Sequence, residues 1–400
     1  MKRKLNILAG DAALWVVFII LSVISLVAVY STIGYSAITE SASTPMTMFM
    51  KHLGFVVVSF VIVILLSKID YRKFSKLSVV GLAVAFVCLL IVMVAGGRRL
   101  NVFGLVAFQP SEFAKIVLMV YLARVMALNK ENLSDKNVFF RLLAVIAIVC
   151  ILVVGENLSM AVLIFVASYI LLFLGGVNRR LWWQGFFALA VLGSVGFAVI
   201  YFFGDQMDFL RTSTWGHRLQ AWLNPDPDEL TQENMARMAV ARGGFFGSGI
   251  GTTIHGRLMT QAHNDFIFAI IIEETGMFAA MIIFALYAMF YFRCIRIANA
   301  CSGVFGSLSV AGIGTVIFLQ AIINMSVAVG VMPVTGQNLP FISYGGSSYL
   351  FLAGGMAVIQ SVARDNKKQQ RLAQRLEAEG DGACIVAPHS GVSNIENDSL

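Results

Sequence analysis

The sequence predicts an all-α polytopic membrane protein, and composition is the first reason. Hydrophobic residues make up 58% of the 400 residues, and only 13% are charged, whereas a soluble domain carries roughly 25% charged residues. The second reason is that apolar runs of about 17–25 residues, the length that crosses a bilayer, recur along the chain. The third is that Lys and Arg are sorted between alternate loops, as membrane topology requires.

These apolar runs are expected to form about ten transmembrane helices. They lie at residues 14–32, 52–67, 77–95, 111–128, 142–154, 158–175, 182–203, 265–290, 306–329 and 346–363. If the N-terminus is cytoplasmic, most of the 29 Lys and Arg residues fall in inside loops or in the C-terminal tail. Because basic loops stay on the cytoplasmic side, we predict that both termini are inside. The net charge of +7 then follows from topology, and no nucleic-acid partner is expected.

The chain is expected to divide into one integral-membrane domain, residues 1–365, and a cytoplasmic tail. The tail, residues 366–400, is polar and is expected to be partly helical and largely disordered. Between the seventh and eighth helices lies a large extracytoplasmic loop, residues 204–264. Residues 96–110 and 331–345 form two shorter outer loops. Long loops without linker composition often carry function, so the chemistry is expected on the outer face.

The stretch 262–268 places His263 and Asp265 at the start of the eighth apolar run. A carboxylate is costly at a membrane boundary, so Asp265 is the candidate catalytic residue. The alternative is that Asp265 caps the helix through backbone N–H groups, and the two roles can coexist. Glu273 and Glu274 lie two turns deeper in the same run, and we expect them to line a polar cavity or to form ion pairs.

The fourth apolar run opens with Pro110, followed by Glu112 and Lys115. A proline and an acidic residue suit the first turn of a helix. Glu112 and Lys115 are three residues apart and share a helix face, so they can neutralise each other. A structural ion pair and a direct role in catalysis both remain open for them.

Arginines occur on the outer face against the topological bias. They are Arg98, Arg99, Arg218, Arg237, Arg242 and Arg257. Arginine suits bidentate recognition of phosphate, so these residues are candidates for binding an anionic substrate. Arg218 carries the most weight because Trp215 and Trp222 beside it indicate an ordered segment.

The run from Val334 to Ser347 is too polar and glycine-rich to continue a helix. At membrane depth such backbone is tolerated only inside protein or beside a wet cavity, and broken segments of this kind commonly form substrate sites. Ser343, Gly345 and Gly346 are therefore candidate substrate-binding residues. Alternatively, the two glycines serve helix packing.

The sequence contains no motif for a nucleotide or a bound metal. It has no G-x-G-x-x-G, Walker or H-E-x-x-H pattern, and its five cysteines show no metal-ligand spacing. No cofactor is evident, and a divalent cation (Mg²⁺ or Mn²⁺) remains possible.

Four segments resemble the SEDS (shape, elongation, division, sporulation) proteins, and the resemblance covers about residues 10–365. The segments are FQPSEFAK at 108–115, RGGFFGSGIG at 242–251, AHNDFIFAIIIEETG at 262–276 and PVTGQNLPFISYGGSS at 333–348. The resemblance implies a peptidoglycan glycosyltransferase that polymerises lipid II into β-1,4-linked glycan strands. It also implies a class B penicillin-binding transpeptidase and other division-complex membrane proteins as partners.

The resemblance also implies roles for individual residues. The essential aspartate of the family falls on Asp265, and an acid and a lysine of its fourth span fall on Glu112 and Lys115. Arg218 resembles the arginine ahead of an F-L-x-P pattern, and Gln232 resembles a glutamine ahead of the glycine-rich loop. Glu112, Lys115, Arg218 and Gln232 are substrate-binding candidates together with His263, Arg98 and Arg99.

The chain departs from the family pattern at two places. Arg99 is followed by Leu100 where tryptophan is usual. Glu156 and Asn157 stand in a segment that usually reads Q-P-D-L-G-T-A, so an aspartate is missing and we assign no catalytic role there. The Glu-Asn-Leu-Ser segment and the pattern Gly10-Asp11…Trp15 favour the division subgroup over the elongation subgroup. The predicted location is the inner membrane at the division septum.

Two other functions fit parts of the sequence. A lipid II flippase would also need many spans and intramembrane charges, although a large outer loop favours chemistry on one face. A non-catalytic scaffold of the division machinery would explain the tail but gives no reason for Asp265.

Overall fold

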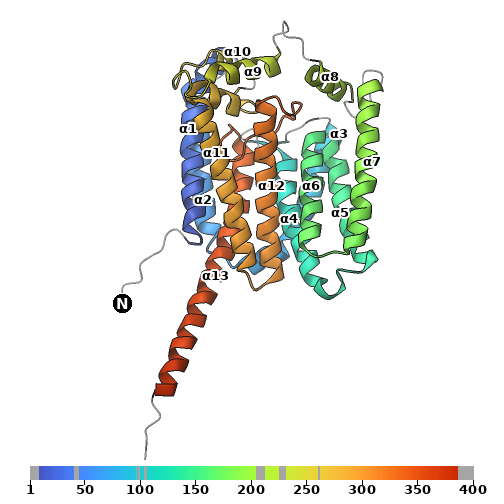
Figure 1. Ribbon diagram of the computed structural model, residues 1–400, viewed down its shortest axis with the longest axis vertical. Coiled ribbons are helices and arrows are strands. Elements are labelled where there is room, and N and C mark those ends of the chain that lie inside the picture. The colour runs from blue at the N-terminus through green and yellow to red at the C-terminus, as the bar shows by residue number, and fades with distance from the viewer. Residues whose placement is uncertain are drawn as a thin grey trace, which may run out of the picture.

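The computed structural model describes residues 9–39, 45–95, 97, 100–102, 106–203, 212–224, 231–259 and 262–385. Long helices run side by side in a bundle, short helices lie across one end of it, and one helix projects from the other end (Figure 1). The elements are α1 (Ala12–Thr39), α2 (Pro45–Leu66), α3 (Tyr71–Ala95), β1 (Leu100–Val102), β2 (Val106–Phe108), α4 (Pro110–Leu128), the 3₁₀ helix η1 (Lys130–Asn132), α5 (Lys136–Val154), α6 (Leu158–Leu174), α7 (Arg179–Phe203), α8 (Thr212–Leu223), α9 (Gln232–Gly243), α10 (His255–Leu258), α11 (Ile267–Asn299), α12 (Val304–Ala328) and α13 (Gly346–Ile385).

The predicted helical membrane fold is confirmed, and each of the predicted apolar runs overlaps a separate long helix. Within the described residues, eight helices are long and apolar enough to cross a membrane, and α6 is a shorter apolar helix. Helix α4 carries the buried Glu112 and Lys115. A count of ten spans and the inside position of both termini stay predictions. The strands β1 and β2 pair antiparallel as a short hairpin, which the sequence analysis did not include.

The buried core runs through the middle of the bundle. Helices α4, α11 and α12 contribute many of its buried residues, because their apolar residues cover most of the helix circumference. Helix α7 stands at the edge of the bundle (Figure 1), and none of the residues in its apolar stretch is buried. The site described below therefore lies among the inner helices.

Helix α11 is broken at Gly276, which has φ 81° and ψ 173°. A Cβ at this position would collide with the backbone of Phe245, so glycine is required there. The freed backbone groups bind the glycine-rich segment 243–251. Met277 N donates to Gly244 O at 3.0 Å, and Ser248 N donates to Glu273 O at 2.9 Å. The break thus fastens the outer layer to a membrane helix.

Two side chains fix where the inner helices begin on the site side. Asn157 caps α6, since its Oδ1 accepts hydrogen bonds from Ser159 N at 2.9 Å and Met160 N at 3.3 Å. Pro110 is the first residue of α4, the position where its missing N–H costs nothing. Both helix starts lie beside the broken segment 331–345.

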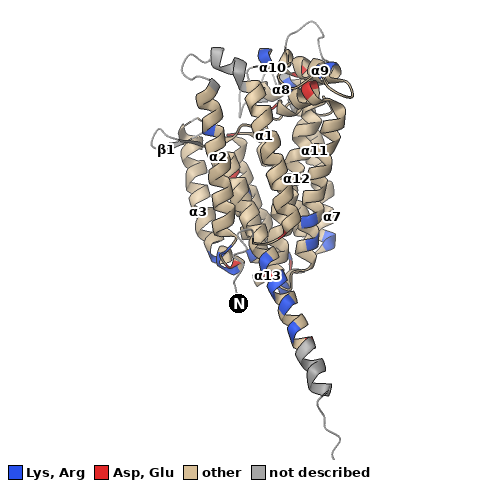
Figure 2. Cartoon of the chain, turned by 90° about the vertical axis from the view of Figure 1, so that its left-hand side faces the viewer, with Lys and Arg blue, Asp and Glu red and all other residues tan. Residues whose placement is uncertain are grey.

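Helix α13 continues past the predicted domain boundary at residue 365 and ends at Ile385. Residues 386–400 of the predicted tail lie outside the described residues. Many Lys and Arg residues lie at the end of the bundle from which α13 projects (Figure 2). The division into residues 1–365 and 366–400 therefore stays a prediction, with the boundary inside one helix.

Candidate active site

Asp265 lies in the turn just before α11, whose N-cap residue is Phe266 rather than Asp265. The cap role considered for Asp265 stays a prediction. Its main-chain carbonyl accepts a hydrogen bond from Asn324 Nδ2 at 2.9 Å. A Cβ built on Gly336, which has φ 64°, would lie 3.6 Å from Asp265 Oδ2 and 3.9 Å from Asn157 Nδ2. The carboxylate and Asn157 thus border the same space beside Gly336.

The segment 331–345 is non-helical, as predicted, and residues 339–343 within it are buried. Ser343 ties it to the turn that carries Asp265: its hydroxyl accepts from Leu339 N at 2.7 Å and donates to Asn264 O at 2.6 Å. Tyr344 N donates to His263 O at 2.9 Å. The two outer segments singled out in the sequence therefore meet in the fold, and Ser343 and His263 hold them together.

Glu112 and Lys115 form a buried ion pair, with 2.5 Å between Lys115 Nζ and Glu112 Oε2. Lys115 Nζ also donates to Gln320 Oε1 at 2.5 Å. Gln320 Nε2 in turn donates to Asn338 O at 2.8 Å. The pair on α4 is therefore linked through α12 to the segment 331–345.

Asn324 completes this link four residues after Gln320 on α12. Its Nδ2 donates to Gln337 O at 2.6 Å and to Asp265 O at 2.9 Å. Gln320 and Asn324 were not assigned a role from the sequence. The sequence does contain a pattern that indicates them, because two amide side chains at positions i and i+4 in an otherwise apolar run mark one polar face of a helix.

Glu156 is a second functional candidate that sequence reasoning missed. It lies between α5 and α6, is 3% exposed, and accepts a hydrogen bond from Ser111 Oγ at 2.9 Å. Its other oxygen, Oε2, has no hydrogen-bond partner. Burial raises the pKa of Glu156 to about 7, against the opposing hydrogen bonds from Ser111 and Gln109. The sequence signal for Glu156 is an acidic residue between two apolar runs. It received no role because this segment departs from the family pattern.

Arg218 lies on α8 and reaches the same region. Its guanidinium donates to Val334 O at 3.2 Å and lies 5.7 Å from the centre of the Trp215 ring. Trp222 Nε1 donates to Gly330 O at 3.1 Å. Helix α8 is thus docked on the beginning of the broken segment, two residues before Gly336.

The remaining candidates fall in different places. Gln232 is the first residue of α9 and is half-buried. Gly345 and Gly346 stand where a Cβ would press on Ser348 and on Phe55, which fits the packing role left open for them. Arg98 and Arg99 lie outside the described residues.

Glu273 forms the ion pairs expected of the acids in α11. Its Oε1 lies 2.8 Å from Arg242 Nη1 and 2.9 Å from His255 Nδ1. Thr253 Oγ1 and the N–H groups of Ile254 and His255 also donate to this carboxylate. Glu274 accepts from Ser31 Oγ and from Gly251 N. These acids hold the outer layer on the bundle rather than line the space beside Asp265.

The part of the chain that the structure describes contains no cluster of side chains suited to binding a metal ion. No group of three or more His, Cys, Asp or Glu side chains there could hold a metal ion. The chemistry available from the described residues is a carboxylate at Asp265, a neutralised acid–lysine pair and a guanidinium at Arg218.

The chain is similar to known proteins over most of its length. A protein of Saccharophagus degradans named "Probable peptidoglycan glycosyltransferase FtsW" is 33% identical over 325 residues, which cover 77% of this chain and 81% of that protein. "Peptidoglycan glycosyltransferase MrdB" of Escherichia coli K12 is 27% identical over 345 residues, covering 83% and 90%.

Solved structures show a similar fold. One comes from work described as "Structural coordination of polymerization and crosslinking by a peptidoglycan synthase complex". It has a TM-score of 0.69 at 25% identity and covers 90% of this chain and 99% of that one. The rod shape determining protein RodA of Thermus thermophilus has a TM-score of 0.61 at 24% identity, covering 90% and 98%.

The family described as "Cell cycle protein", which groups FtsW, RodA and SpoVE, matches residues 11–368. That range contains every segment that meets around Asp265. The chain is a multi-pass membrane protein that belongs to the SEDS family.

Proposed function

We propose that this protein is a peptidoglycan glycosyltransferase that polymerises lipid II. The observation that carries the proposal is the position of Asp265: its carboxylate borders the space beside Gly336, where the turn before α11 meets the broken segment 331–345. Two relatives are named as peptidoglycan glycosyltransferases. A helix-terminal carboxylate facing a broken membrane segment suits proton transfer at the membrane surface.

In the proposed reaction Asp265 acts as general base. It accepts the proton of the acceptor sugar's 4-hydroxyl as the hydroxyl oxygen bonds to the anomeric carbon of the donor. The bond from that carbon to undecaprenyl diphosphate breaks, and inversion gives a β-1,4 link. General-base catalysis contributes about 10²–10⁴-fold. The leaving diphosphate needs nearby positive charge, for which Arg218, Arg98 and Arg99 are the candidates, with Mg²⁺ or Mn²⁺ as a further source.

The buried network from Glu112 to Asn324 supports this role by positioning. It fixes the segment 331–345 against the turn at Asp265 with side-chain amides on α12. Such preorganisation removes the cost of ordering the site during the reaction. Gln232, His263, Ser343, Gly345 and Gly346 are proposed to shape or hold the substrate-binding surface around it.

The test is glycan-ladder formation from fluorescent lipid II by the purified protein in detergent. Asp265→Asn is expected to lower the rate at least about 100-fold, while a thermal melt stays close to that of the unchanged protein. Glu131→Gln is the matched control, because it removes one exposed carboxylate far from the site. Full activity of Asp265→Asn would refute the general-base role. A flippase or a scaffold would give no ladder even without substitution, since flipping needs two compartments.

The partner and the cellular role belong to the same proposal. We propose that the protein acts in division at the septum of the inner membrane with a class B penicillin-binding transpeptidase and other division-complex membrane proteins. The complex whose structure is similar couples polymerisation with crosslinking, and the relative from S. degradans is named FtsW. Depletion should therefore give filaments. Rounded cells of normal division would assign the protein to elongation instead.

We also propose that residues 1–365 carry the enzyme and that residues 386–400, the end of the tail, are dispensable for polymerisation. Truncation after Ile385, the last residue of α13, should leave ladder formation within about twofold of the full chain. A large loss in the same assay would place part of the enzyme in the tail.

A further inference from the structure

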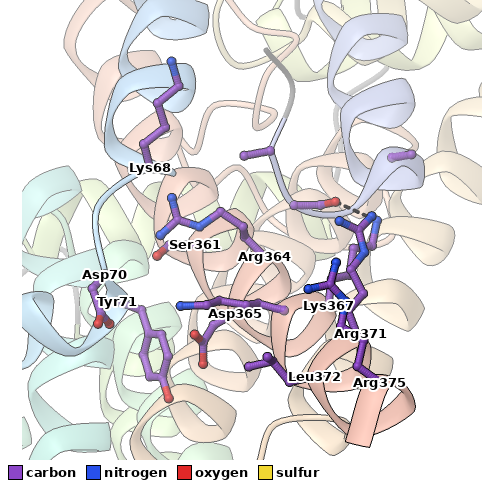
Figure 3. Close-up of a pocket in the computed structure, with 14 residues that line it drawn as sticks. Lys68, Asp70, Tyr71, Ser361, Arg364, Asp365, Lys367, Arg371, Leu372 and Arg375 are labelled. Carbon is purple, nitrogen blue, oxygen red and sulfur yellow. Dashed lines mark hydrogen bonds between the residues drawn. The ribbon is translucent and has the colours of Figure 1, made fainter. Parts of the chain in front are cut away.

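A basic cleft opens at the end of the bundle opposite Asp265. It has a volume of about 830 Å³ and lies between the chain just before α1, the turn from α2 to α3, and the inner part of α13. Six cationic side chains line it: Lys68, Arg364, Lys367, Lys368, Arg371 and Arg375. Figure 3 shows Lys68 and Arg364 toward one side of the opening and Lys367, Arg371 and Arg375 toward the other.

The walls of the basic cleft are fixed by hydrogen bonds between distant parts of the chain. Asp11 N donates to Gln360 Oε1 at 2.6 Å, and Lys367 Nζ donates to Gly10 O at 2.8 Å. Ser361 Oγ donates to Ile69 O at 2.5 Å, which holds the turn between α2 and α3 against α13. The cleft is therefore built from three elements that are fastened to one another.

Glycine is required at one of these contacts. Gly10 has φ +96°, and a Cβ there would collide with the Gln360 side chain. The start of α1 can approach α13 this closely only because residue 10 has no side chain. The close approach sets the width of the cleft on that side.

The charges of the basic cleft are largely uncompensated. Only two carboxylates, Asp70 and Asp365, line it with the six cations, and Asp365 already accepts from Gln369 Nε2 at 2.7 Å. Among the described residues, no ion pair is found for Lys68, Lys368, Arg371 or Arg375. The side chains that line the cleft therefore carry an excess of positive charge.

Helical spacing adds to this imbalance. Arg364, Lys368, Arg371 and Arg375 are separated by four, three and four residues, so they lie along one face of α13. Like charges four residues apart repel each other and destabilise a helix. A bound anion would remove that repulsion.

The place of the basic cleft says which anion fits. The cleft lies where α1 begins, α2 ends and α3 begins, which is the level of phospholipid headgroups for helices that cross a bilayer. Basic pockets between helices at this level bind anionic headgroups, and guanidinium groups match the geometry of phosphate. We propose that the basic cleft binds the phosphate headgroup of an anionic phospholipid.

The test measures phospholipid binding to the full-length protein by native mass spectrometry in a non-ionic detergent. The unchanged protein should retain phosphatidylglycerol more tightly than phosphatidylcholine. The double variant Lys368→Gln with Arg371→Gln should weaken phosphatidylglycerol binding roughly 20-fold, since each basic side chain near an anionic surface contributes on the order of fivefold. Both side chains are exposed and make no hydrogen bond or ion pair within the described residues, so the melt should be unchanged.

The matched control is Arg179→Gln with Arg180→Gln, at the start of α7. It removes two exposed charges outside the cleft and should leave phosphatidylglycerol binding within about twofold. An equal loss in both double variants would mean diffuse surface attraction and would overturn the proposal. So would the absence of any preference for phosphatidylglycerol in the unchanged protein.

A second arm separates a lipid headgroup from free phosphate. Inorganic phosphate at millimolar concentration should displace little phosphatidylglycerol, because it lacks the acyl chains that lie along the ends of the membrane helices. Displacement of the lipid by millimolar phosphate would identify the ligand as a soluble phosphate and refute a lipid site.

Arg375→Gln alone should weaken lipid binding by about fivefold.

Discussion

Two buried acids on membrane helices have similar charge and different neighbours. Glu112 on α4 pairs with a fully buried lysine of its own helix and connects onward through side-chain amides. Glu273 on α11 pairs with Arg242, whose side chain is 33% exposed, and accepts backbone N–H groups of the outer layer. The first acid belongs to a sealed polar network that reaches Asp265. Glu273 joins the outer layer to the helix bundle, and water can reach its partner Arg242.

This difference shows how a charged residue within an apolar run should be interpreted. The sequence shows only that a carboxylate lies inside a hydrophobic helix, and that is equally true of both acids. What separates them is whether the compensating charge is buried, because an unpaired charge in the interior cannot be resolvated. Substitutions that remove one partner should therefore act far more strongly at Glu112 than at Glu273.

The largest effect is expected when the Glu112–Lys115 pair is broken. Glu112→Gln leaves Lys115 charged with 0% exposure, and an uncompensated buried charge costs about 3–5 kcal/mol. Adding Lys115→Met to Glu112→Gln should recover most of this loss in a thermal melt, since no unpaired charge remains. If the double variant is as stable as the unchanged protein and yet forms no glycan ladder, the pair acts on substrate in addition to its structural role.

A smaller effect is expected at the other acid. Glu273→Ala removes an acceptor shared by Arg242, His255 and Thr253, and a hydrogen bond to a charged group contributes about 1.5–3 kcal/mol. Arg242 is 33% exposed and regains water, so no unpaired charge stays buried and the loss should stay below that of Glu112→Gln. Hydrogen exchange of the amides of Ile254 and His255, which donate to this carboxylate, should rise strongly.

Glu131→Gln serves as control for the Glu273 measurement, because its carboxylate is exposed and lies in η1, between α4 and α5. Unchanged exchange at residues 254 and 255 in Glu273→Ala, together with a lost glycan ladder, would contradict the fastening role. It would instead place Glu273 in contact with substrate and remove the contrast with Glu112.

Local patterns sufficed for much of the fold because helix length and apolar content are read from consecutive residues. Every predicted apolar run overlaps a helix, and the segment 331–345 was recognised as broken from its glycines and polar side chains. The contact between Ser343 and Asn264 could be expected only from resemblance to a family. No local pattern specifies which loop meets which across 79 residues.

The parts that could not be predicted depend on packing between distant segments. Gly276 lies inside an apolar run that looks continuous, and its break follows from contact with the glycine-rich segment around Phe245. Gln320 and Asn324 can link α4 to the segment 331–345 only because α12 lies between them. Glu156 was set aside because it stands one position away from the family's aspartate, although burial and Ser111 give it a defined place.

Glu156 sharpens the comparison through pH, because its contribution changes gradually between about pH 4.5 and 7. It lies on the Glu112 side, where the charge of Glu112 adds to burial in raising its pKa from 4.5 to about 7. Because the folded pKa exceeds the unfolded one, Glu156 contributes stability in full below about pH 4.5. That contribution is lost as pH rises toward 7, by at most about 1.4 kcal/mol per pH unit.

Thermal melts of the unchanged protein and of Glu156→Gln between pH 4.5 and 8 measure this contribution. Glutamine keeps an acceptor for Ser111 Oγ and cannot ionise, so the difference between the two proteins cancels the titration of all other groups. The unchanged protein should lose stability relative to Glu156→Gln as pH rises, and the difference should level off above about pH 7. Parallel curves across this range would mean that Glu156 is ionised in the folded protein and that water or Lys115 compensates it, which would make the Glu112 side as well hydrated as the Glu273 side.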